Sequence, residues 1–387
     1  MSKWKIEKLI DVCNVQYGYP FDSKLFSDSD GMPLIRIRDV IRGYSETFTT
    51  ESYKEEYVVK RGDMLIGMDG EFNIARWGNT PALLNQRVCR IIPKQNVDKD
   101  YIYYAMPKAL KEIEDRTPFV TVKHLSAKEI NKIEIPLPPL ETQHKIAATL
   151  DKVTHTIDLC NAILEKLDLL VKSRFVEMFG DPIDNPMGWE VKALKELSTL
   201  ITNGNTPKGG SEKYVDEGII FLRSQNVWRN RIDLSDVAYI DEDTHNKMKK
   251  SIVKHKDILI TKTGRINTEN SSLGRAALYL GEDGSANING HVYLVRLNGT
   301  VVPEYVVTIL TGEAYRKYIR KVCVGGIDKR QINLDQVEEF PIILTPKTMQ
   351  QQFAAFVEQT DKSKLAVKQV LEKAETLKKA LMQEYFG

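Results

Sequence analysis

The stretch PLETQHKIAATLDKVTHTIDLCNAILEKLDLLVKSRFVEMFG, residues 139–180, returns at the end of the chain as PKTMQQQFAAFVEQTDKSKLAVKQVLEKAETLKKALMQEYFG, residues 346–387. The two copies align without a gap at an offset of 207 residues, since 139 pairs with 346 and 180 with 387. Identical residues run through both copies, from Gln143 and Gln350 near the start to the Phe-Gly pair that closes each. An internal repeat of this length decides how the rest of the chain is organised.

Each copy is predicted to form one helix of about 60 Å, because roughly forty residues rise about 1.5 Å each. Apolar residues recur at alternating steps of four and three, the heptad spacing of a helix that packs lengthwise on a partner. Lys364 and Lys378 interrupt this spacing in the second copy. An alternative is two unconnected amphipathic helices, each packed on its own domain. The predicted seam consists of Ile146, Leu150, Val153, Ile157, Leu164 and Leu167 in the first copy and Phe353, Val357, Val367, Leu371 and Leu381 in the second.

The regions that precede the two helices also resemble each other. Trp4 and Trp189 open them, and each is followed by a glycine–proline turn, an arginine-bearing apolar run and a second apolar run, at 59–66 or 253–260. The irregular mixture of predicted strands and short helices indicates an α+β fold. We predict two similar domains on a nearly symmetric pair of helices. The parts are a first domain over 1–138, a long helix over 139–180, a second domain over 181–345 and a second long helix over 346–387.

The composition bounds the class of protein. The chain of 387 residues is 42% hydrophobic and 28% charged, as expected for a soluble globular protein of two or three domains. We expect no signal peptide and no membrane-spanning segment. The four cysteines form no CxxC pair, which argues against structural zinc and favours the reducing cytoplasm. The net charge is only +2, so a surface for nucleic acid has to be a local patch.

No catalytic constellation is recognisable. The chain has no GxxxxGK[ST] phosphate loop, and its six histidines show no metal-ligand spacing. Residues 184–187 read Asp-Asn-Pro-Met, a weak version of the NPP[YF] motif of amino-methyltransferases that lacks its second proline and its aromatic residue. Asp63, Asp69 and Glu71 resemble a nuclease carboxylate set, but the second half of the repeat does not preserve them.

Basic and amide side chains are concentrated in predicted turns of both domains. Residues 244–265 carry seven lysines and arginines against one acid, which suits phosphate neutralisation, although a solvated charge run is the usual explanation for lysines. Arginine pairs bidentately with guanine, and asparagine or glutamine with adenine. The candidate DNA-binding residues of the first domain are Arg36, Arg38, Arg42, Arg61, Asn73, Arg76, Gln86, Arg87, Lys123 and His124. Those of the second are Arg223, Gln225, Asn226, Arg229, Arg231, Lys262, Thr263, Arg265, Asn267, Asn289, His291, Lys329 and Arg330.

With these features, the whole chain resembles a specificity subunit of a Type I restriction–modification system. The run Pro-Leu-Pro-Pro-Leu-Glu-Thr-Gln at 136–143, placed before a long helix, is fairly specific for that family. The paired tryptophans and the Phe-Gly helix ends also carry the resemblance. The second connector departs from the pattern, since Ile-Leu-Thr-Pro at 343–346 replaces the proline-rich form.

The resemblance implies two target-recognition domains, each reading one half of a bipartite site on double-stranded DNA. It implies that the long helices form an antiparallel coiled coil with pseudo-two-fold symmetry. Two modification (methyltransferase) subunits and the restriction (translocase) subunits would dock on this chain. S-adenosylmethionine, Mg²⁺ and ATP would be bound by those partners, and this chain would hold no cofactor.

Two other functions are compatible with a two-domain chain. A DNA methyltransferase or nuclease acting in its own right would bind a methyl donor or a metal, for which no motif is recognisable. A coiled-coil scaffold without DNA binding would not need arginine-bearing turns in both domains. Salt-dependent DNA binding distinguishes the scaffold from the leading prediction.

Overall fold

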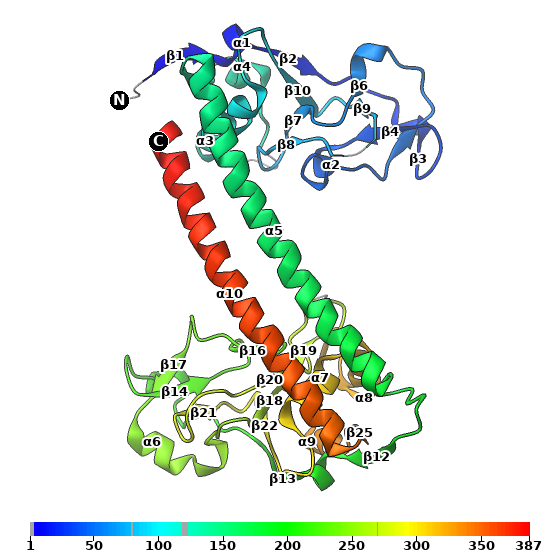
Figure 1. Cartoon of the computed structure of the whole chain (residues 1–387), viewed down its shortest axis with the longest axis vertical. Coiled ribbons are helices and arrows are strands. Elements are labelled where there is room, and N and C mark those ends of the chain that lie inside the picture. The colour runs from blue at the N-terminus through cyan, green and yellow to red at the C-terminus, as the bar shows by residue number, and fades with distance from the viewer. Residues whose placement is uncertain (1–3, 79, 118–122, 269) are drawn as a thin grey trace. The chain divides into compact units, whose positions relative to one another are not determined.

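The computed structural model describes residues 4–387 except 79, 118–122 and 269. It divides into two compact units: unit 1 comprises Met1–Asn161 with Lys368–Gly387, and unit 2 comprises Ala162–Val367. Each unit therefore contains one globular domain and a segment of both long helices (Figure 1). Both domains mix strands and short helices, which confirms the predicted α+β class.

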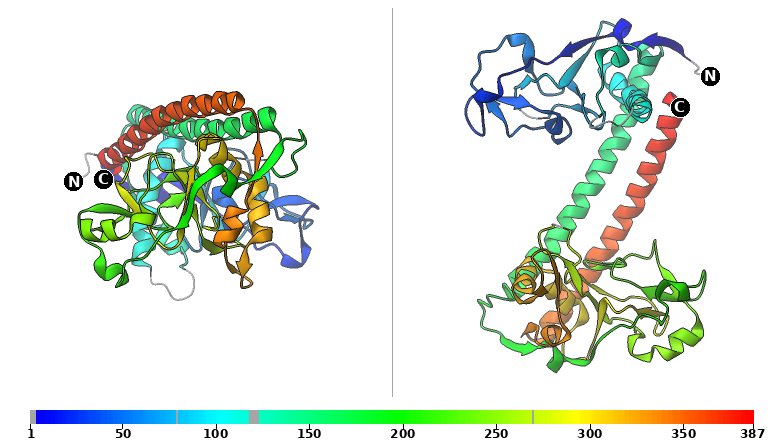
Figure 2. Two further views of the ribbon diagram at one scale, coloured as in Figure 1. Left: turned by 90° about the horizontal axis from the view of Figure 1, so that it is seen from below. Right: turned by 180° about the vertical axis from the view of Figure 1, so that it is seen from behind.

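The two copies of the repeat form the helices α5 (Leu140–Phe179) and α10 (Lys347–Phe386). In unit 1 the first turns of α5 share a core with the last turn of α10, since Ile146, Leu150 and Phe386 belong to one buried cluster. In unit 2 the last turns of α5 meet the first turns of α10, where Phe175 packs on Phe353. The front and rear views show the same pairing (Figure 1 and Figure 2). The helices are therefore antiparallel, and the alternative of two unconnected helices is wrong.

The predicted seam residues face inward. Ile146, Leu150 and Phe353 are buried, and the remaining eight are partly buried. Lys364, which interrupts the seam, extends its ammonium group to Asp168 on the other helix, with Nζ and Oδ1 2.7 Å apart. Burial alone would lower the pKa of Lys364, but the carboxylates of Asp168 and Asp361 raise it above its ordinary value. The interruption is therefore an ion pair within the seam of unit 2.

Unit 1 contains an antiparallel sheet, a mixed sheet and a strand pair that joins the domain to α5. The antiparallel sheet has the order β2 (Cys13–Tyr17), β10 (Val88–Pro93), β7 (Met64–Gly67), β8 (Ile74–Arg76). The mixed sheet has the order β3 (Phe26–Ser27), β5 (Phe48–Thr49), β4 (Met32–Ile35), β9 (Ala82–Leu84), β6 (Val58–Val59). The strand pair is β1 (Lys5–Lys8) with β11 (Glu134–Leu137), and the helices are α1 (Leu9–Val12), α2 (Ile37–Arg42), α3 (Lys99–Arg116) and α4 (Ala127–Ile130).

Unit 2 repeats this plan. Its antiparallel sheet has the order β13 (Ser198–Asn203), β22 (Val292–Leu297), β18 (Ile258–Thr261), β20 (Ala276–Leu278), and β12 (Glu190–Ala193) pairs with β25 (Pro341–Leu344). The mixed sheet is β17 (Ala238–Ile240), β14 (Ile219–Leu222), β21 (Ala286–Ile288), with β14 and β21 parallel as β4 and β9 are. Two small sheets are added: β15 (Val227–Trp228) with β16 (Arg231–Ile232), and β19 (Thr263–Arg265), β24 (Lys329–Gln331), β23 (Val324–Gly325). The helices are α6 (Glu242–Lys247), α7 (Pro303–Thr311), α8 (Glu313–Val322) and α9 (Leu334–Glu338).

Two glycines at matched positions reveal the common scaffold. The amide of Gly18 donates to the carbonyl of Val88, and that of Gly204 donates to the carbonyl of Val292, both at 3.0 Å. A Cβ atom at Gly18 would lie 2.1 Å from the Asn85 carbonyl oxygen, and one at Gly204 would lie 2.2 Å from that of Ile288. Only glycine allows this approach of two backbones, so the turn after β2 and the turn after β13 are the same structural element.

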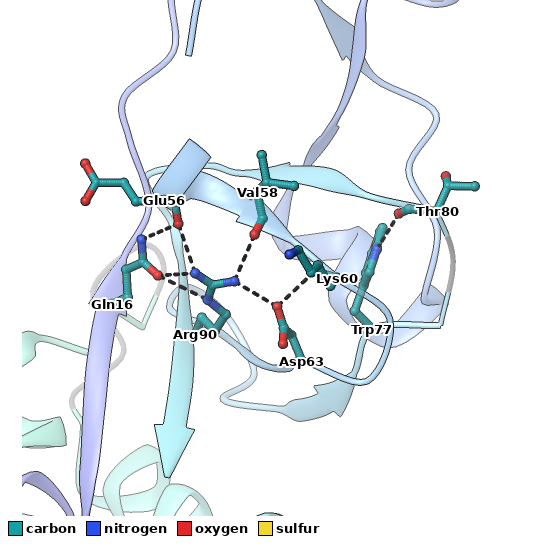
Figure 3. A network of polar contacts seen from close by, with 8 residues as sticks. All are labelled: Gln16, Glu56, Val58, Lys60, Asp63, Trp77, Thr80 and Arg90. Atoms are coloured by element: carbon teal, nitrogen blue, oxygen red, sulfur yellow. Dashed lines mark hydrogen bonds and ion pairs between the residues drawn. The ribbon is translucent and has the colours of Figure 1, made fainter. Parts of the chain in front are cut away.

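An aspartate–arginine pair fixes the turn before the central strand in each domain. Asp63 accepts hydrogen bonds from the backbone amide of Lys60 (2.9 Å) and from Nη1 of Arg90 (2.8 Å), as Figure 3 shows. In unit 2, Asp257 accepts from Nε of Arg296 at 2.9 Å and from its Nη2 at 2.6 Å. Asp63 is therefore engaged in holding the fold and is not available as a nuclease carboxylate.

The glutamines that are identical in the two copies lock each long helix to its domain. The side chain of Gln143 is 1% exposed; its Nε2 donates to the carbonyl of Pro138 (2.8 Å), and its Oε1 accepts from the amide of Asp98 (2.9 Å). Gln350 repeats both bonds at the same two lengths, with the carbonyl of Thr345 and the amide of Val302. Asp98 and Val302 are the N-caps of α3 and α7, so each glutamine joins the start of a long helix to the start of a domain helix.

Replacing Phe353 should destabilise unit 2. Its ring is fully buried and lies 5.5 Å from the ring centroid of Phe175 and 5.7 Å from that of Phe179. Phe353→Ala is expected to lower the free energy of unfolding by about 3–5 kcal/mol, because it leaves a cavity among aromatic side chains. Leu365→Ala on the same helix, at a 60% exposed position, should change it by less than about 0.5 kcal/mol. Urea unfolding followed by tryptophan fluorescence measures both, and equal stabilities would contradict the assigned packing.

Candidate nucleic-acid interface

In both domains the predicted DNA-binding turns are brought together by the same pair of backbone hydrogen bonds. In unit 1 the amide of Met68, after β7, donates to the carbonyl of Arg87 (2.9 Å), and the amide of Leu125 donates to the carbonyl of Met68 (2.7 Å). In unit 2, Lys262 takes the place of Met68, donating to His291 and accepting from Ile332, both at 2.9 Å. Three turns that are distant in the sequence therefore meet at one edge of each antiparallel sheet.

In unit 1 this edge carries a charged triad. His124 Nδ1 lies 2.6 Å from Oδ1 of Asp69, and Arg87 Nε lies 3.6 Å from Oδ2 of the same carboxylate. Arg87 Nη1 also approaches His124 Nδ1, at 3.3 Å. Both Arg87 and His124 are exposed. Asp69 orients two hydrogen-bonding side chains toward solvent, an arrangement that suits contact with base edges or phosphates.

A shallow hollow of about 250 Å³ lies beside the triad, between α2 and the turn that follows β7. Arg38, Asp69, Glu71 and Asn73 contribute its polar lining. Arg36 caps α2 through its backbone, since its amide donates to the Asp39 carboxylate at 2.9 Å, and its side chain is exposed. The structure thus groups four of the predicted residues of the first domain around Asp69 and the hollow, namely Arg38, Asn73, Arg87 and His124. Arg36 lies at the start of α2.

In unit 2 the corresponding edge is extended by the sheet β19–β24–β23. Residues of β19 pair with residues of β24, so that Arg265 lies opposite Lys329, and Thr263 opposite Gln331. Arg265 and Lys329 are exposed, and Lys262 is partly buried with its Nζ 5.8 Å from the centroid of the Tyr293 ring. The basic residues predicted separately from 262–265 and from 329–330 therefore form one surface.

A second basic cluster in unit 2 surrounds Trp228 on the β15–β16 hairpin. The guanidinium carbon of Arg275 lies 3.9 Å from the centroid of this indole ring, and that of Arg231 lies 5.2 Å from it. Arg275 is only 8% exposed and donates to the backbone carbonyls of Ser271 and Asn270. Burial lowers its pKa, and the positive charges of Arg229 and Arg231 lower it further. Like charges gathered in this way attract an anion such as a phosphate.

Sequence reasoning missed Arg275. It precedes a buried strand, β20, and nothing in the local sequence pattern indicates a guanidinium packed against an indole ring. The available signal was Trp228, because an aromatic ring between arginines is a common cation–π arrangement.

Several predicted DNA-binding residues have structural roles. Arg76 is held 3.0 Å from Asp100 and 3.2 Å from Asp151, and its guanidinium carbon lies 4.2 Å from the centroid of the Tyr103 ring. Burial would lower the pKa of Arg76, but these carboxylates raise it above its ordinary value. Lys123 turns back to the carbonyl of Glu114, 2.6 Å from its Nζ. The polar atoms of both side chains are therefore used within unit 1. Arg76 and Lys123 are no longer candidates for contact with DNA.

In unit 2, predicted DNA-binding residues near Asp236 also have structural roles. Asn226 is 2% exposed; its Nδ2 donates to the carbonyls of Asp233 (3.0 Å) and Asp236 (2.7 Å), so it stabilises a turn. Arg223 and Gln225 both donate to the Asp236 side chain, at 3.2 and 2.7 Å. Gln225 is exposed and keeps a donor for solvent, whereas Arg223 is partly buried. Gln225 therefore remains a candidate for contact with DNA, whereas Asn226 does not.

The remaining candidates lie on turns or helix ends. Arg42 is paired with Glu46 at 3.2 Å, and Arg330 bonds the carbonyl of Gly326 at 2.9 Å. Asn289 Oδ1 accepts from the amide of His291 at 3.0 Å and so shapes the turn before β22. The other exposed candidates are Arg61, Gln86, Arg229, Arg231, Asn267 and His291.

The described residues contain no cluster of three or more His, Cys, Asp or Glu side chains arranged to hold a metal ion. Within the same part of the chain, no helix combines the length and apolarity needed to cross a membrane. The chemistry available at both edges is hydrogen bonding and charge, which serves recognition of a polyanion.

The structure thus combines a duplicated α+β scaffold, each copy of which presents a polar edge, with an antiparallel pair of long helices. A sequence model of the Type I restriction modification DNA specificity domain matches residues 1–169 and again residues 186–376. The chain therefore belongs to this family.

Known relatives agree with this assignment. The chain is 31% identical over 336 residues to the Type I restriction enzyme EcoBI specificity subunit of Escherichia coli, a match covering 80% of this chain and 67% of that protein. It is 25% identical over 387 residues to the MjaIX specificity subunit of Methanocaldococcus jannaschii, covering 92% of this chain and 86% of the relative.

Solved structures share the fold at low sequence identity. The crystal structure of the Type-I restriction-modification system S subunit from M. genitalium matches with a TM-score of 0.64 and 15% identity, over 100% of this chain and 96% of that chain. A structure described as the basis of complex assembly and conformational transition of the type I R-M system matches with a TM-score of 0.52 and 16% identity, over 99% and 97% of the two chains.

The different roles of Arg76 and Arg61 can be tested by one pair of variants. Arg76→Ala should lower the free energy of unfolding by about 1–2 kcal/mol, because it breaks partly buried charged hydrogen bonds and leaves Asp151 without its guanidinium partner. Arg61→Ala, at an exposed turn, should change stability by less than about 0.5 kcal/mol. Chemical denaturation of the full chain provides the measurement. If the Arg76→Ala chain were as stable as the parent, the structural role of Arg76 would be contradicted, and Arg76 would again be a candidate for contact with DNA.

Proposed function

We propose that this chain is the non-catalytic DNA-recognition subunit of a Type I restriction–modification complex. Each domain reads one half of a bipartite site on double-stranded DNA. The observation that carries the proposal is the repeated pair of backbone bonds at Met68 and Lys262, which places three turns at one edge in both domains. The scaffold is constant, but the side chains it presents differ: Asp69, Arg87 and His124 in unit 1 against Lys262, Arg265 and Lys329 in unit 2. Different side chains on one scaffold suit two different half-sites.

The rival function, a methyltransferase or nuclease in its own right, has little support from the described residues. Asp63 and Asp69 are engaged with arginine or histidine, and no group of metal ligands converges among the residues placed by the structure. In the proposed function, partner subunits bind S-adenosylmethionine, Mg²⁺ and ATP and carry out methylation and restriction. The role of this chain is to choose the site and to hold those partners there.

The long helices offer matched surfaces for two modification subunits. Leu170 on α5 and Leu377 on α10 occupy equivalent positions of the repeat and are 48% and 50% exposed. Leu169 and Val176 in unit 2 and Val370 in unit 1 are further exposed apolar residues of these helices. Apolar side chains on the outer face of an already paired helix favour protein partners. Because the positions repeat, we propose that two copies of one partner dock in the same way.

Exchange of the second domain tests the reading function. Replacing residues 181–345 by the corresponding segment of a Type I specificity subunit with another target should change one half-site of the methylated sequence and leave the other intact. The measurement is methylome sequencing of cells that carry the hybrid with its modification subunits, with the parent chain beside it.

The purified chain alone should transfer no methyl group to DNA. Alteration of both half-sites would contradict independent readers, and methyl transfer by the chain alone would contradict a non-catalytic role.

Partner docking is tested at the repeated leucines. Leu170→Asp and Leu377→Asp should each weaken the binding of one modification subunit by roughly tenfold or more, since a buried leucine is worth about 1.5–3 kcal/mol. Each single variant should therefore reduce the bound stoichiometry from two to one, and the double variant should abolish binding. Leu365→Asp is the control, because the first copy of the repeat already has Asp158 at that position. Analytical ultracentrifugation of the mixed proteins gives the stoichiometry, and unchanged binding by the double variant would place the partners elsewhere.

A further inference from the structure

The hairpin formed by β23 and β24 in unit 2 carries an apolar side chain at its tip. Ile327 is 90% exposed, although it is flanked by residues with many polar contacts. No described residue of the chain covers it. Single exposed apolar residues are common on protein surfaces, so the role of Ile327 has to be argued from the turn that presents it and from the charges around it.

The turn that presents Ile327 is held in place. Nε of Arg330 donates to the carbonyl of Gly326 (2.9 Å), and the amide of Ile266, after β19, donates to the carbonyl of Asp328 (3.0 Å). Gly325 has φ 126°, a conformation that other residues rarely adopt. The exposure of Ile327 is therefore a consequence of a braced turn, since the bonds on both sides of it fix the backbone.

The surroundings of Ile327 indicate what covers it. Arg265 and Lys329 are exposed beside the hairpin, and the one acid of the turn, Asp328, is 3.4 Å from Arg265. Charged residues are depleted from the cores of protein–protein interfaces, so an apolar tip within a basic surface suits a polyanion better than a protein. The surface is also continuous with Lys262 and Arg265 of the proposed reading edge.

The shape of the hairpin favours the major groove of DNA. That groove admits a two-stranded β-ribbon, and its apolar group is the 5-methyl of thymine. Gly325 and Gly326 carry no side chains on one side of the tip, which allows the backbone to approach the base edges closely. Lys329 follows on the other side, where its exposed ammonium group can reach phosphates.

We propose that Ile327 contacts the 5-methyl group of a thymine in the half-site read by the second domain, and so contributes to sequence specificity. This inference rests on the proposed function. It adds an apolar contact to a reading surface that otherwise consists of hydrogen bonds and charge.

The test uses the full chain co-purified with its modification subunits and duplexes that carry the methylated site of the parent. Each thymine of the second half-site is replaced in turn by uracil, which pairs identically but lacks the methyl group. For the parent chain, uracil at one position should weaken binding about fourfold, the equivalent of losing one buried methyl-sized group. Ile327→Ala should weaken binding to the unmodified duplex by at least that factor, and it should no longer respond to uracil at that position.

Two further variants serve as controls. Ile327→Val retains branched apolar contact and should keep most of the affinity and the response to uracil. Leu280→Ala removes another exposed apolar side chain of unit 2, 67% exposed and outside the hairpin, and should bind as the parent does.

Three outcomes would overturn the inference: a parent that is indifferent to every uracil, an Ile327→Ala variant that retains the affinity and uracil response of the parent, or one that loses modification subunits while its DNA affinity is unchanged. A parent chain that binds a duplex lacking the methylated site as tightly as one that carries it would instead refute the proposed function itself. The two failures are therefore distinguishable.

Discussion

The buried side chains of Gln143 and Gln350 are the interaction on which the architecture depends. The side chain of each glutamine donates to the backbone carbonyl just before a long helix and accepts from the backbone N–H at the start of a domain helix. Neither backbone group is therefore left without a hydrogen bond in the core. A buried backbone group without a hydrogen bond costs about 1–3 kcal/mol. Because one side chain serves both ends, the long helix and its domain keep a fixed mutual orientation inside each unit.

The repeat made the fold predictable, whereas the site depended on partners that are distant in the sequence. The helices and their seam follow from local periodicity, and the repeated glutamines were visible as identities. Arg76 was assigned to DNA because it follows a polar turn, yet its carboxylate partners lie on α3 and α5. From the sequence, Asn226 was predicted to contact a DNA base, but in the structure its side chain stabilises a turn. Ile327 lies in a segment selected for its polar residues, and only its exposure distinguishes it.

The two domains show how a scaffold is kept while its surface changes. Asp63 and Asp257 precede equivalent strands, but the arginines that bind them, Arg90 and Arg296, occupy different register positions. Arg90 lies opposite Leu65, whereas Leu294 holds the corresponding place opposite Leu259. A shift of two residues along a strand keeps a side chain on the same face of the sheet. The pair therefore survives divergence of the strands, and the turns are free to vary.

The cores of the two units draw on both copies of the repeat. Phe386, from the second copy, belongs to the core of unit 1, and Phe179, its equivalent in the first copy, belongs to the core of unit 2. A protein made from the first half alone would carry Phe179 but lack Phe386. Two such half-chains can supply each other with the missing aromatic residue, since the residue is the same in both copies. The repeat therefore makes each half of the chain complementary to a second copy of itself, as the subunits of a two-fold homodimer are.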